Sequence, residues 1–192
     1  ARIADSARIV GDVTVGARCY IDHQVVIESS GPAIEIGPEV IVFAGSVVRS
    51  VGGHARPPFA VTIGARTLVS PHCTLTGCRI GRMCYLATAA IVLQGAVLGS
   101  GTLIGAGAMA HAGTRLPEGT RVGMRHIAVP AEDGFLSTAD IERARETLGP
   151  ASFFETAFGL GDTDQASRHE QLMAQLLEEV SRWHDEPLAR AE

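Results

Sequence analysis

An aliphatic residue recurs at every sixth position over most of the chain. Counted from Ile3, eighteen of nineteen such positions hold Ile, Val or Leu, and the remaining one holds Ala110. An amphipathic helix needs a period of about 3.6 residues, and a half-buried strand alternates with a period of about 2. Neither produces this pattern. The repeat positions are Ile3, Ile9, Val15, Ile21, Ile27, Ile36, Val42, Val48, Ile63, Val69, Leu75, Ile80, Leu86, Val92, Leu98, Ile104, Ala110, Leu116 and Val122.

The hexapeptide period predicts a mainly β fold, a left-handed parallel β-helix with C-terminal α-helices. Each hexapeptide supplies one short strand and one tight turn, and three of them complete a triangular coil of about 18 residues. The aliphatic side chain points into the prism, and successive coils pair as parallel strands. Gly often follows the aliphatic residue, as at Gly16 and Gly64, and suits a sharp corner. Since only 5% of the residues are aromatic, the core must consist of small and branched side chains.

The period also predicts the domain organisation. Residues 1–130 form the β-helix and residues 131–192 a helical extension. Ser137–Asp140 is typical of a capping box, which would open a helix that stops at Gly149-Pro150. A longer helix is expected over residues 164–184, packed on the β-helix of its own or a neighbouring subunit. Its apolar stripe would comprise Leu172, Leu176, Val180 and Trp183.

Composition and charge exclude several classes of partner. The formal net charge is −5, with acidic and basic residues mixed along the chain, so no basic stripe favours nucleic acid. No apolar run reaches the ~18 residues that a membrane span needs, and the first residues lack the apolar core of a signal peptide. The cysteines form no CxxC pair, which favours free thiols and a cytoplasmic protein. They are Cys19, Cys73, Cys78 and Cys84.

Short motifs surround a break in the period, where one residue is missing between Leu75 and Ile80. With these motifs, the segment from Thr62 to Gly123 resembles the γ-class carbonic anhydrases, which skip one residue at the same point. The interruption from Arg49 to Thr62 falls where that family carries a loop. The resemblance covers roughly Ile3 to Val129 and implies a homotrimer. Its motifs are Thr62-Ile-Gly64, Leu75-Thr-Gly-Cys78, Ile80-Gly81, Ala89-Ala-Ile-Val-Leu-Gln-Gly95 and Gly105-Ala-Gly107.

The zinc ligands of that family are replaced in this chain. The family binds zinc through three histidines at the subunit interface, and Arg49, Pro71 and Thr76 stand at the corresponding positions. Zinc needs N, S or O donors, and neither an arginine nor a proline side chain offers one at neutral pH. His72 lies one residue beyond a ligand position, where a strand would turn it to the opposite face. The resemblance therefore implies no metal and no other cofactor.

A polar column is expected where the zinc site would be. Residues that follow every third repeat position share one face of the prism, which places Glu28, Arg49 and Thr76 on adjacent coils with Leu93 and His111 beyond them. Opposite charges on neighbouring strands predict an ion pair between Glu28 and Arg49.

Other candidate site residues are expected near this column. His72 and Tyr85 are expected at the same edge, and the interruption supplies His54 and Arg56 before two prolines. A cleft with this composition favours a small anion, a carboxylate or a phosphate. Arg49 would clamp the anion, and His72 or His54 would act as the general base. Glu28, Arg56, Thr76 and Tyr85 would bind the substrate.

Each of these residues also has a structural interpretation. The pair of Glu28 and Arg49 could belong to a trimer interface, and His72 could donate a hydrogen bond there. His54 could be a solvated loop residue, and His111, which small residues flank, could be structural. The four thiols would be buried or lie at an interface.

Three functions remain open from the sequence. The first is a zinc-free γ-carbonic anhydrase-like protein whose interface cleft binds or transforms a small polar or anionic molecule. If it is an enzyme, its activity would be metal-independent and of the lyase or hydrolase type. The second is a hexapeptide acyltransferase that uses acyl-CoA, with a loop histidine such as His54 as base. The third is a non-catalytic assembly subunit.

Overall fold

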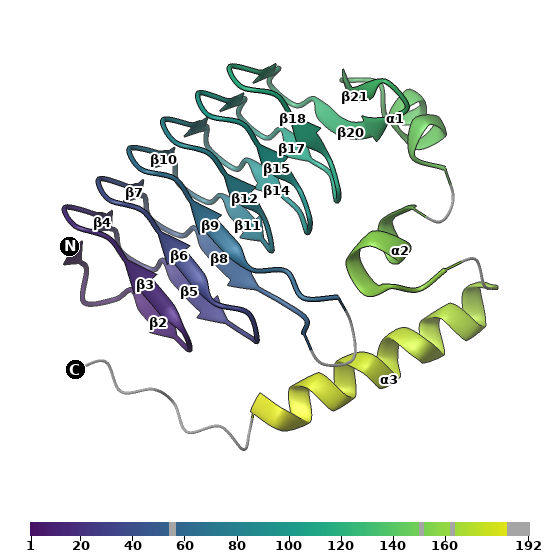
Figure 1. The fold of residues 1–192 in the computed structure, drawn as a ribbon, viewed down its shortest axis with the longest axis horizontal. Coiled ribbons are helices and arrows are strands. Elements are labelled where there is room, and N and C mark those ends of the chain that lie inside the picture. The colour runs from purple at the N-terminus through teal and green to yellow at the C-terminus, as the bar shows by residue number, and fades with distance from the viewer. Residues whose placement is uncertain (54–56, 150–151, 162–163, 184–192) are drawn as a thin grey trace.

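The computed structural model describes residues 1–53, 57–149, 152–161 and 164–183, and it confirms the left-handed parallel β-helix with C-terminal helices. Short strands form three sheets, here named sheet A, sheet B and sheet C, which are the three faces of a prism. The coils stack in chain order along the prism (Figure 1). The corners are named by the sheets that they join: the A/B, B/C and C/A corners.

The strands of each sheet come from successive coils. Sheet A contains β1 (Arg2–Ile3), β4 (Tyr20–Ile21), β7 (Ile41–Val42), β10 (Leu68–Val69), β13 (Tyr85–Leu86), β16 (Leu103–Ile104) and β19 (Arg121–Val122). Sheet B contains β2 (Arg8–Val10), β5 (Val26–Ser29), β8 (Val47–Ser50), β11 (Thr74–Thr76), β14 (Ile91–Val92), β17 (Met109–Ala110), β20 (Ile127–Ala131) and β21 (Gly134–Thr138). Sheet C contains β3 (Val13–Val15), β6 (Ile34–Ile36), β9 (Val61–Ile63), β12 (Arg79–Ile80), β15 (Val97–Leu98) and β18 (Arg115–Leu116).

The repeat residues fill the prism, as the period predicts. In sheet A, Val42 pairs with Val69, Val69 with Leu86 and Leu86 with Ile104, and all four side chains are fully buried. Each coil therefore contributes its aliphatic side chains to one continuous core. Each of these side chains packs on the one at the equivalent position of the next coil.

Buried hydroxyl and thiol groups tie neighbouring coils together at the corners. Ser46 Oγ donates to the carbonyl of Ser70 at 3.0 Å, and Thr67 Oγ1 donates to that of Gly81 at 3.0 Å. Cys73 Sγ lies 3.2 Å from the carbonyl oxygen of Ala87. These contacts satisfy polar groups that would otherwise be costly to bury. They explain why a core of aliphatic residues contains buried Ser, Thr and Cys.

Replacing Thr67 with Val should destabilise the β-helix. Thr67 Oγ1 also accepts a hydrogen bond from the backbone N–H of Cys84 at 3.2 Å, and the residue is buried. Valine keeps the shape but leaves both backbone groups without this partner, so the free energy of unfolding should fall by about 1–3 kcal/mol in urea denaturation. The control is Thr120→Val, whose hydroxyl bonds Pro117 near the surface and should cost less than about 0.5 kcal/mol. Equal effects would contradict this account.

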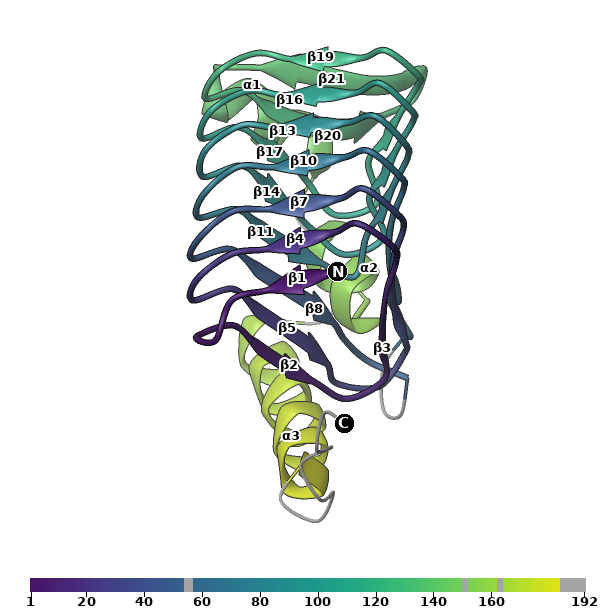
Figure 2. The same ribbon diagram turned by 90° about the vertical axis from the view of Figure 1, so that its left-hand side faces the viewer.

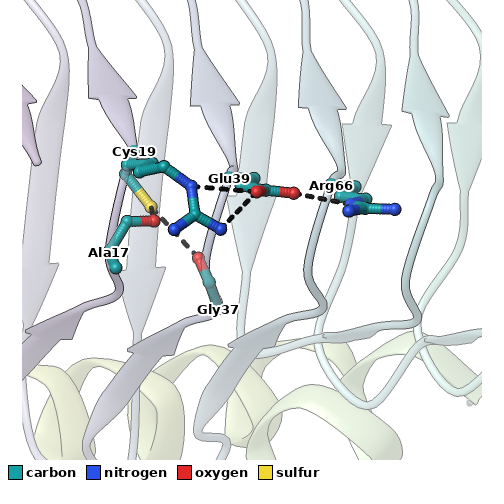
Figure 3. A network of polar contacts seen from close by, with 6 residues as sticks. Ala17, Cys19, Gly37, Glu39 and Arg66 are labelled. Atoms are coloured by element: carbon teal, nitrogen blue, oxygen red, sulfur yellow. Dashed lines mark hydrogen bonds and ion pairs between the residues drawn. The ribbon is translucent and has the colours of Figure 1, made fainter.

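An ion-pair ladder runs along the C/A corner. Glu39 accepts hydrogen bonds from Arg18 of the preceding coil and from Arg66 of the following coil, the latter at 2.5 Å (Figure 3). Arg66 and, to a lesser extent, Arg18 hold the pKa of Glu39 below its ordinary value. The three residues adopt left-handed backbone angles at equivalent turns, which brings their side chains together.

The C-terminal segment closes one end of the prism. β20 extends sheet B by one strand beyond the last repeat position, and β21 pairs with it antiparallel. α1 (Ile141–Leu148) packs on this hairpin (Figure 1). The predicted capping box is wrong in detail, because Ser137 belongs to β21. Asp140 caps the helix instead, by accepting from the backbone N–H of Arg143 at 3.2 Å.

Two further helices follow. α2 (Ser152–Phe158) was not predicted, and α3 (Gln165–Trp183) matches the predicted long helix. Of the predicted stripe, Leu172 and Leu176 are partly buried, whereas the side chains of Val180 and Trp183 lie outside the described residues. In the described part of the chain, no helix is long and apolar enough to cross a membrane.

Candidate functional site

The predicted ion pair between Glu28 and Arg49 is present on the outer face of sheet B. The two residues are opposite one another in β5 and β8, and Arg49 Nη2 lies 3.2 Å from Glu28 Oε1. Ser30 Oγ donates to the same carboxylate oxygen at 2.8 Å. The side chain of Arg49 is 36% exposed to solvent and that of Glu28 is 29% exposed. The carboxylate therefore orients a guanidinium that solvent still reaches.

Thr76 completes this group on the next coil. It pairs with Arg49 in β11, and its side chain is half-buried. Leu93 and His111 continue the same column, as the repeat predicts. We call Glu28, Ser30, Arg49 and Thr76 the Arg49 edge, because they lie where sheet B approaches the B/C corner.

Two of the breaks in the hexapeptide period, the interruption before Ile63 and the missing residue before Ile80, belong to one structural feature. Strand β8 continues through Ser50, and an antiparallel bridge between Val51 and Phe59 joins the two described ends of the interruption, residues 51–53 and 57–60. Phe59 lies against Gly77, the left-handed residue of the shortened turn, where any Cβ would overlap the Cβ of Phe59. The turn between Leu75 and Ile80, which is one residue short, is therefore the turn on which Phe59 packs. The loop stem, residues 51–53 and 57–60, thus stands directly beside the Arg49 edge.

Of the other predicted site residues, the two that the structure describes, His72 and Tyr85, do not lie beside Arg49 within one chain. His72 lies at the A/B corner, where its ring covers Gly45, and it precedes Thr76 by four positions, which is at most about 13 Å of extended chain. Tyr85 is on the outer face of sheet A and 43% exposed, so its predicted proximity to the sheet B column is not observed. His54 and Arg56 lie outside the described residues.

Sequence reasoning missed two buried polar groups near the Arg49 edge. Ser50 is fully buried and Gln94 is 9% exposed, and within the described ranges neither Ser50 Oγ nor Gln94 Oε1 has a hydrogen-bond partner. They occupy positions near the B/C corner where the repeat allows several small or polar residues. No periodic signal therefore distinguishes them.

A second polar group lies at the A/B corner. Tyr20 donates its hydroxyl to Asp22 at 3.1 Å, and the backbone N–H of His23 donates to the same carboxylate at 2.8 Å. The backbone hydrogen bond from His23 is the main reason that the pKa of Asp22 lies below its ordinary value. Ser6 Oγ lies 2.8 Å from His23 Nδ1. These groups lie on the first two coils, at the same corner that His72 occupies on a later coil.

The residues that replace the zinc ligands do not fit a metal. Arg49 is held by Glu28, Pro71 has no donor, and Thr76 offers one neutral hydroxyl. Among the described residues, no three His, Cys, Asp or Glu side chains come together as a metal site would require. The burial of the thiols is consistent with structural roles, and burial raises the pKa of Cys78 to about 12.

A groove of about 430 Å³ lies on a different face, sheet C. Its lining includes Glu35, Thr62 and the backbone of Gly37 and Gly64. The groove is open and shares no residue with the Arg49 edge. At the Arg49 edge an oriented cation lies beside a hydroxyl group and the loop stem, and this combination suits an anionic ligand.

No protein-family model and no curated protein matches the sequence. Several solved structures are similar in fold. One is UDP-N-acetylglucosamine O-acyltransferase from Moraxella catarrhalis, with 16% identity, coverage of 94% of this chain and 88% of that chain, and a TM-score of 0.46. A hexapeptide transferase family protein from Anaplasma phagocytophilum has 20% identity, coverages of 90% and 89%, and a TM-score of 0.43. PerB from Caulobacter crescentus, solved with CoA and GDP-perosamine, has 22% identity, coverages of 71% and 56%, and a TM-score of 0.41. At these identities and TM-scores, the likeness carries no activity over to this chain.

Proposed function

We propose that the Arg49 edge binds a small anion, a carboxylate or a phosphate, within a homotrimer. The observation that carries the proposal is the Arg49 guanidinium, which Glu28 orients while more than a third of its side chain stays exposed. A guanidinium matches the two oxygens of a carboxylate or phosphate with parallel N–H donors. Thr76 adds a hydroxyl on the neighbouring strand, and the loop stem closes one side.

The distribution of apolar side chains over the three faces supports the homotrimer. Sheet C presents charged and hydroxyl groups to solvent, including Glu35, Arg79 and Arg115. In Figure 2 sheet A faces the viewer, and no described helix covers it. Three copies that pack sheet A against sheet B would bury apolar surface around the A/B corner, where His72 stands. The outward apolar residues are Tyr20, Ile41, Leu68, Tyr85 and Leu103 on sheet A, and Val26, Val47, Ile91 and Met109 on sheet B.

Transfer of an acyl group from acyl-CoA is the second candidate, and the loop beside Arg49 favours it. A general base on such a loop would take the proton from an acceptor amine or hydroxyl. The acceptor would then attack the thioester carbonyl, and the CoA thiol would leave. The phosphates of CoA are anions of the class that Arg49 suits. In this candidate His54 would be the base and Arg56 a further anion contact.

Ligand stabilisation of the full-length chain tests the two candidates together. Bicarbonate, inorganic phosphate, acetate, CoA and acetyl-CoA are added separately, and the melting temperature is followed. A ligand at ten times its Kd should raise the melting temperature by about 3 °C or more. Stabilisation by the small anions supports the first candidate, and stabilisation by acetyl-CoA alone supports acyl transfer. No stabilisation by any of the five at millimolar concentration contradicts both candidates and leaves the assembly role.

The same sample tests the oligomer. Sedimentation equilibrium should give three times the chain mass of 20.1 kDa. A mass equal to one chain at micromolar concentration would contradict the trimer.

A further inference from the structure

Helix α2 connects the sheet B column to the loop beside Arg49. At one end, the ring of Phe153 meets that of His111 edge to face, with centroids 5.6 Å apart. In the middle of the helix, Thr156 lies against Gly113, where a Cβ would come 3.4 Å from Thr156 Cγ2. Just beyond the helix, a Cβ on Gly159 would lie 3.3 Å from Cδ of Pro57 in the loop stem. One short helix therefore touches both the column and the loop.

The apolar side chains of α2 and of the residues directly after it are buried or in contact with one another. Ala157 is fully buried and Leu160 is 5% exposed. Phe153 and Phe154 both pack on Phe158, with ring centroids 6.0 and 6.2 Å away. Such aromatic contacts stabilise the helix beyond the apolar area that they bury. The helix is thus held firmly enough to position what it touches.

We propose that α2 is a positioning element that holds the loop against the B/C corner, and that protonation of His111 weakens this hold. The loop in turn flanks the Arg49 edge through the bridge between Val51 and Phe59. Displacing α2 removes the contact with Pro57 and leaves the loop stem with the contacts of Phe59, its own bridge, and the packing of Gly52 on Gly31. The consequence for anion binding rests on the proposed function, whereas the coupling of α2 to the loop does not.

The surroundings of His111 make its contact with Phe153 sensitive to protonation of the imidazole ring. Its Nδ1 atom is buried and has no hydrogen-bond partner among the described residues, and burial lowers the pKa of the ring below its ordinary value. A positive charge there would lie beside the Phe153 ring, and no ion pair or hydrogen bond to Nδ1 from the described residues would offset it. Glu155, the acidic residue of α2, is exposed, and Arg168 of α3 lies over Phe154. The column neighbours Leu93 and Val129 are uncharged.

The sign of the pH effect follows from the lowered pKa. The released or unfolded state binds a proton near the ordinary histidine value of about 6.5, while the docked state resists it. Docking is therefore at full strength above about pH 6.5 and weakens as the pH falls below it, by up to tenfold in the docking equilibrium per pH unit until the docked ring itself protonates.

Amide hydrogen exchange of the full-length chain tests the coupling. The amides of Val51 and Phe59 donate to each other's carbonyls at 3.1 and 2.8 Å, so their protection reports on the loop. In Phe153→Ala, exchange of both amides should be at least tenfold faster. Thr156→Arg should have the same effect from the other contact. The matched control is Glu155→Ala on the exposed side of α2, which should leave both amides unchanged.

The pH dependence gives an independent readout. After correction for intrinsic exchange rates, protection of Val51 and Phe59 in the wild type should fall between pH 7.5 and 5.5, and His111→Phe should remove this fall. The proposal is overturned if Phe153→Ala exposes the amides of α2 but leaves the loop protected. It is also overturned if His111→Phe keeps the pH dependence. Neither result would bear on whether Arg49 binds an anion.

Discussion

Replacing Gly64 with Ala should cost about 3 kcal/mol of unfolding free energy or prevent folding altogether. Gly64 follows β9 at the C/A corner, where a Cβ would lie 2.5 Å from the backbone N of Arg82 and from the backbone C of Gly81. These atoms belong to the next coil, whose Ile80 carbonyl accepts from the N–H of Gly64 at 2.8 Å. The next coil cannot move away without breaking the parallel pairing. Urea denaturation followed by circular dichroism measures the effect.

The matched control for this glycine is Gly161→Ala. Among the described residues, no atom outside its chain neighbours lies within 4 Å of a Cβ built there. The substitution should therefore change the free energy of unfolding by less than about 0.5 kcal/mol. A Gly64→Ala variant as stable as Gly161→Ala would show that the coils are not stacked as described.

Replacing Leu75 with Ala should reduce the free energy of unfolding by about 2–5 kcal/mol. Leu75 is fully buried and pairs with Val48 and Val92 on the coils to either side. Because backbone hydrogen bonds fix both neighbouring coils, the prism cannot collapse into the space, and a cavity remains. Leu177→Ala on α3 removes the same atoms from a side chain that is 63% exposed, and it should cost far less. Similar losses in the two variants would contradict the inward orientation of Leu75.

The sequence predicts the β-helix because its periodicity and its packing arise from the same cause. A residue such as Val69 must point inward in every coil, so the aliphatic period records which side chains form the core. The same register places Glu28 opposite Arg49, and the ion pair of the candidate site follows from it. Tyr85, expected near the edge of the sheet B column, lies on sheet A beside Leu68, and the register itself places it there.

Features that break the period depend on tertiary contacts and are less predictable. The missing residue after Leu75 is visible in the sequence, but the contact of the shortened turn with Phe59, sixteen positions upstream of Leu75, is not. Ser137 and Asp140 both have side chains that can cap a helix, and the pairing of β20 with β21 decides between them. The short helix α2 is stabilised by the contact of Phe153 with His111 and by contacts among its own phenylalanines. No local sequence pattern predicts these contacts.

The most direct test of the anion site is a calorimetric titration of the full-length chain with inorganic phosphate and with bicarbonate. The wild type should bind at least one of them saturably, with one site per chain. The double variant Glu28→Gln/Arg49→Met, which removes both charges of the ion pair, should stay folded and bind at least tenfold more weakly. Arg115→Met on sheet C is the control and should bind as the wild type does. Equal affinity in the double variant and the wild type, or no binding of either anion by the wild type, would contradict the assignment of the site to Arg49.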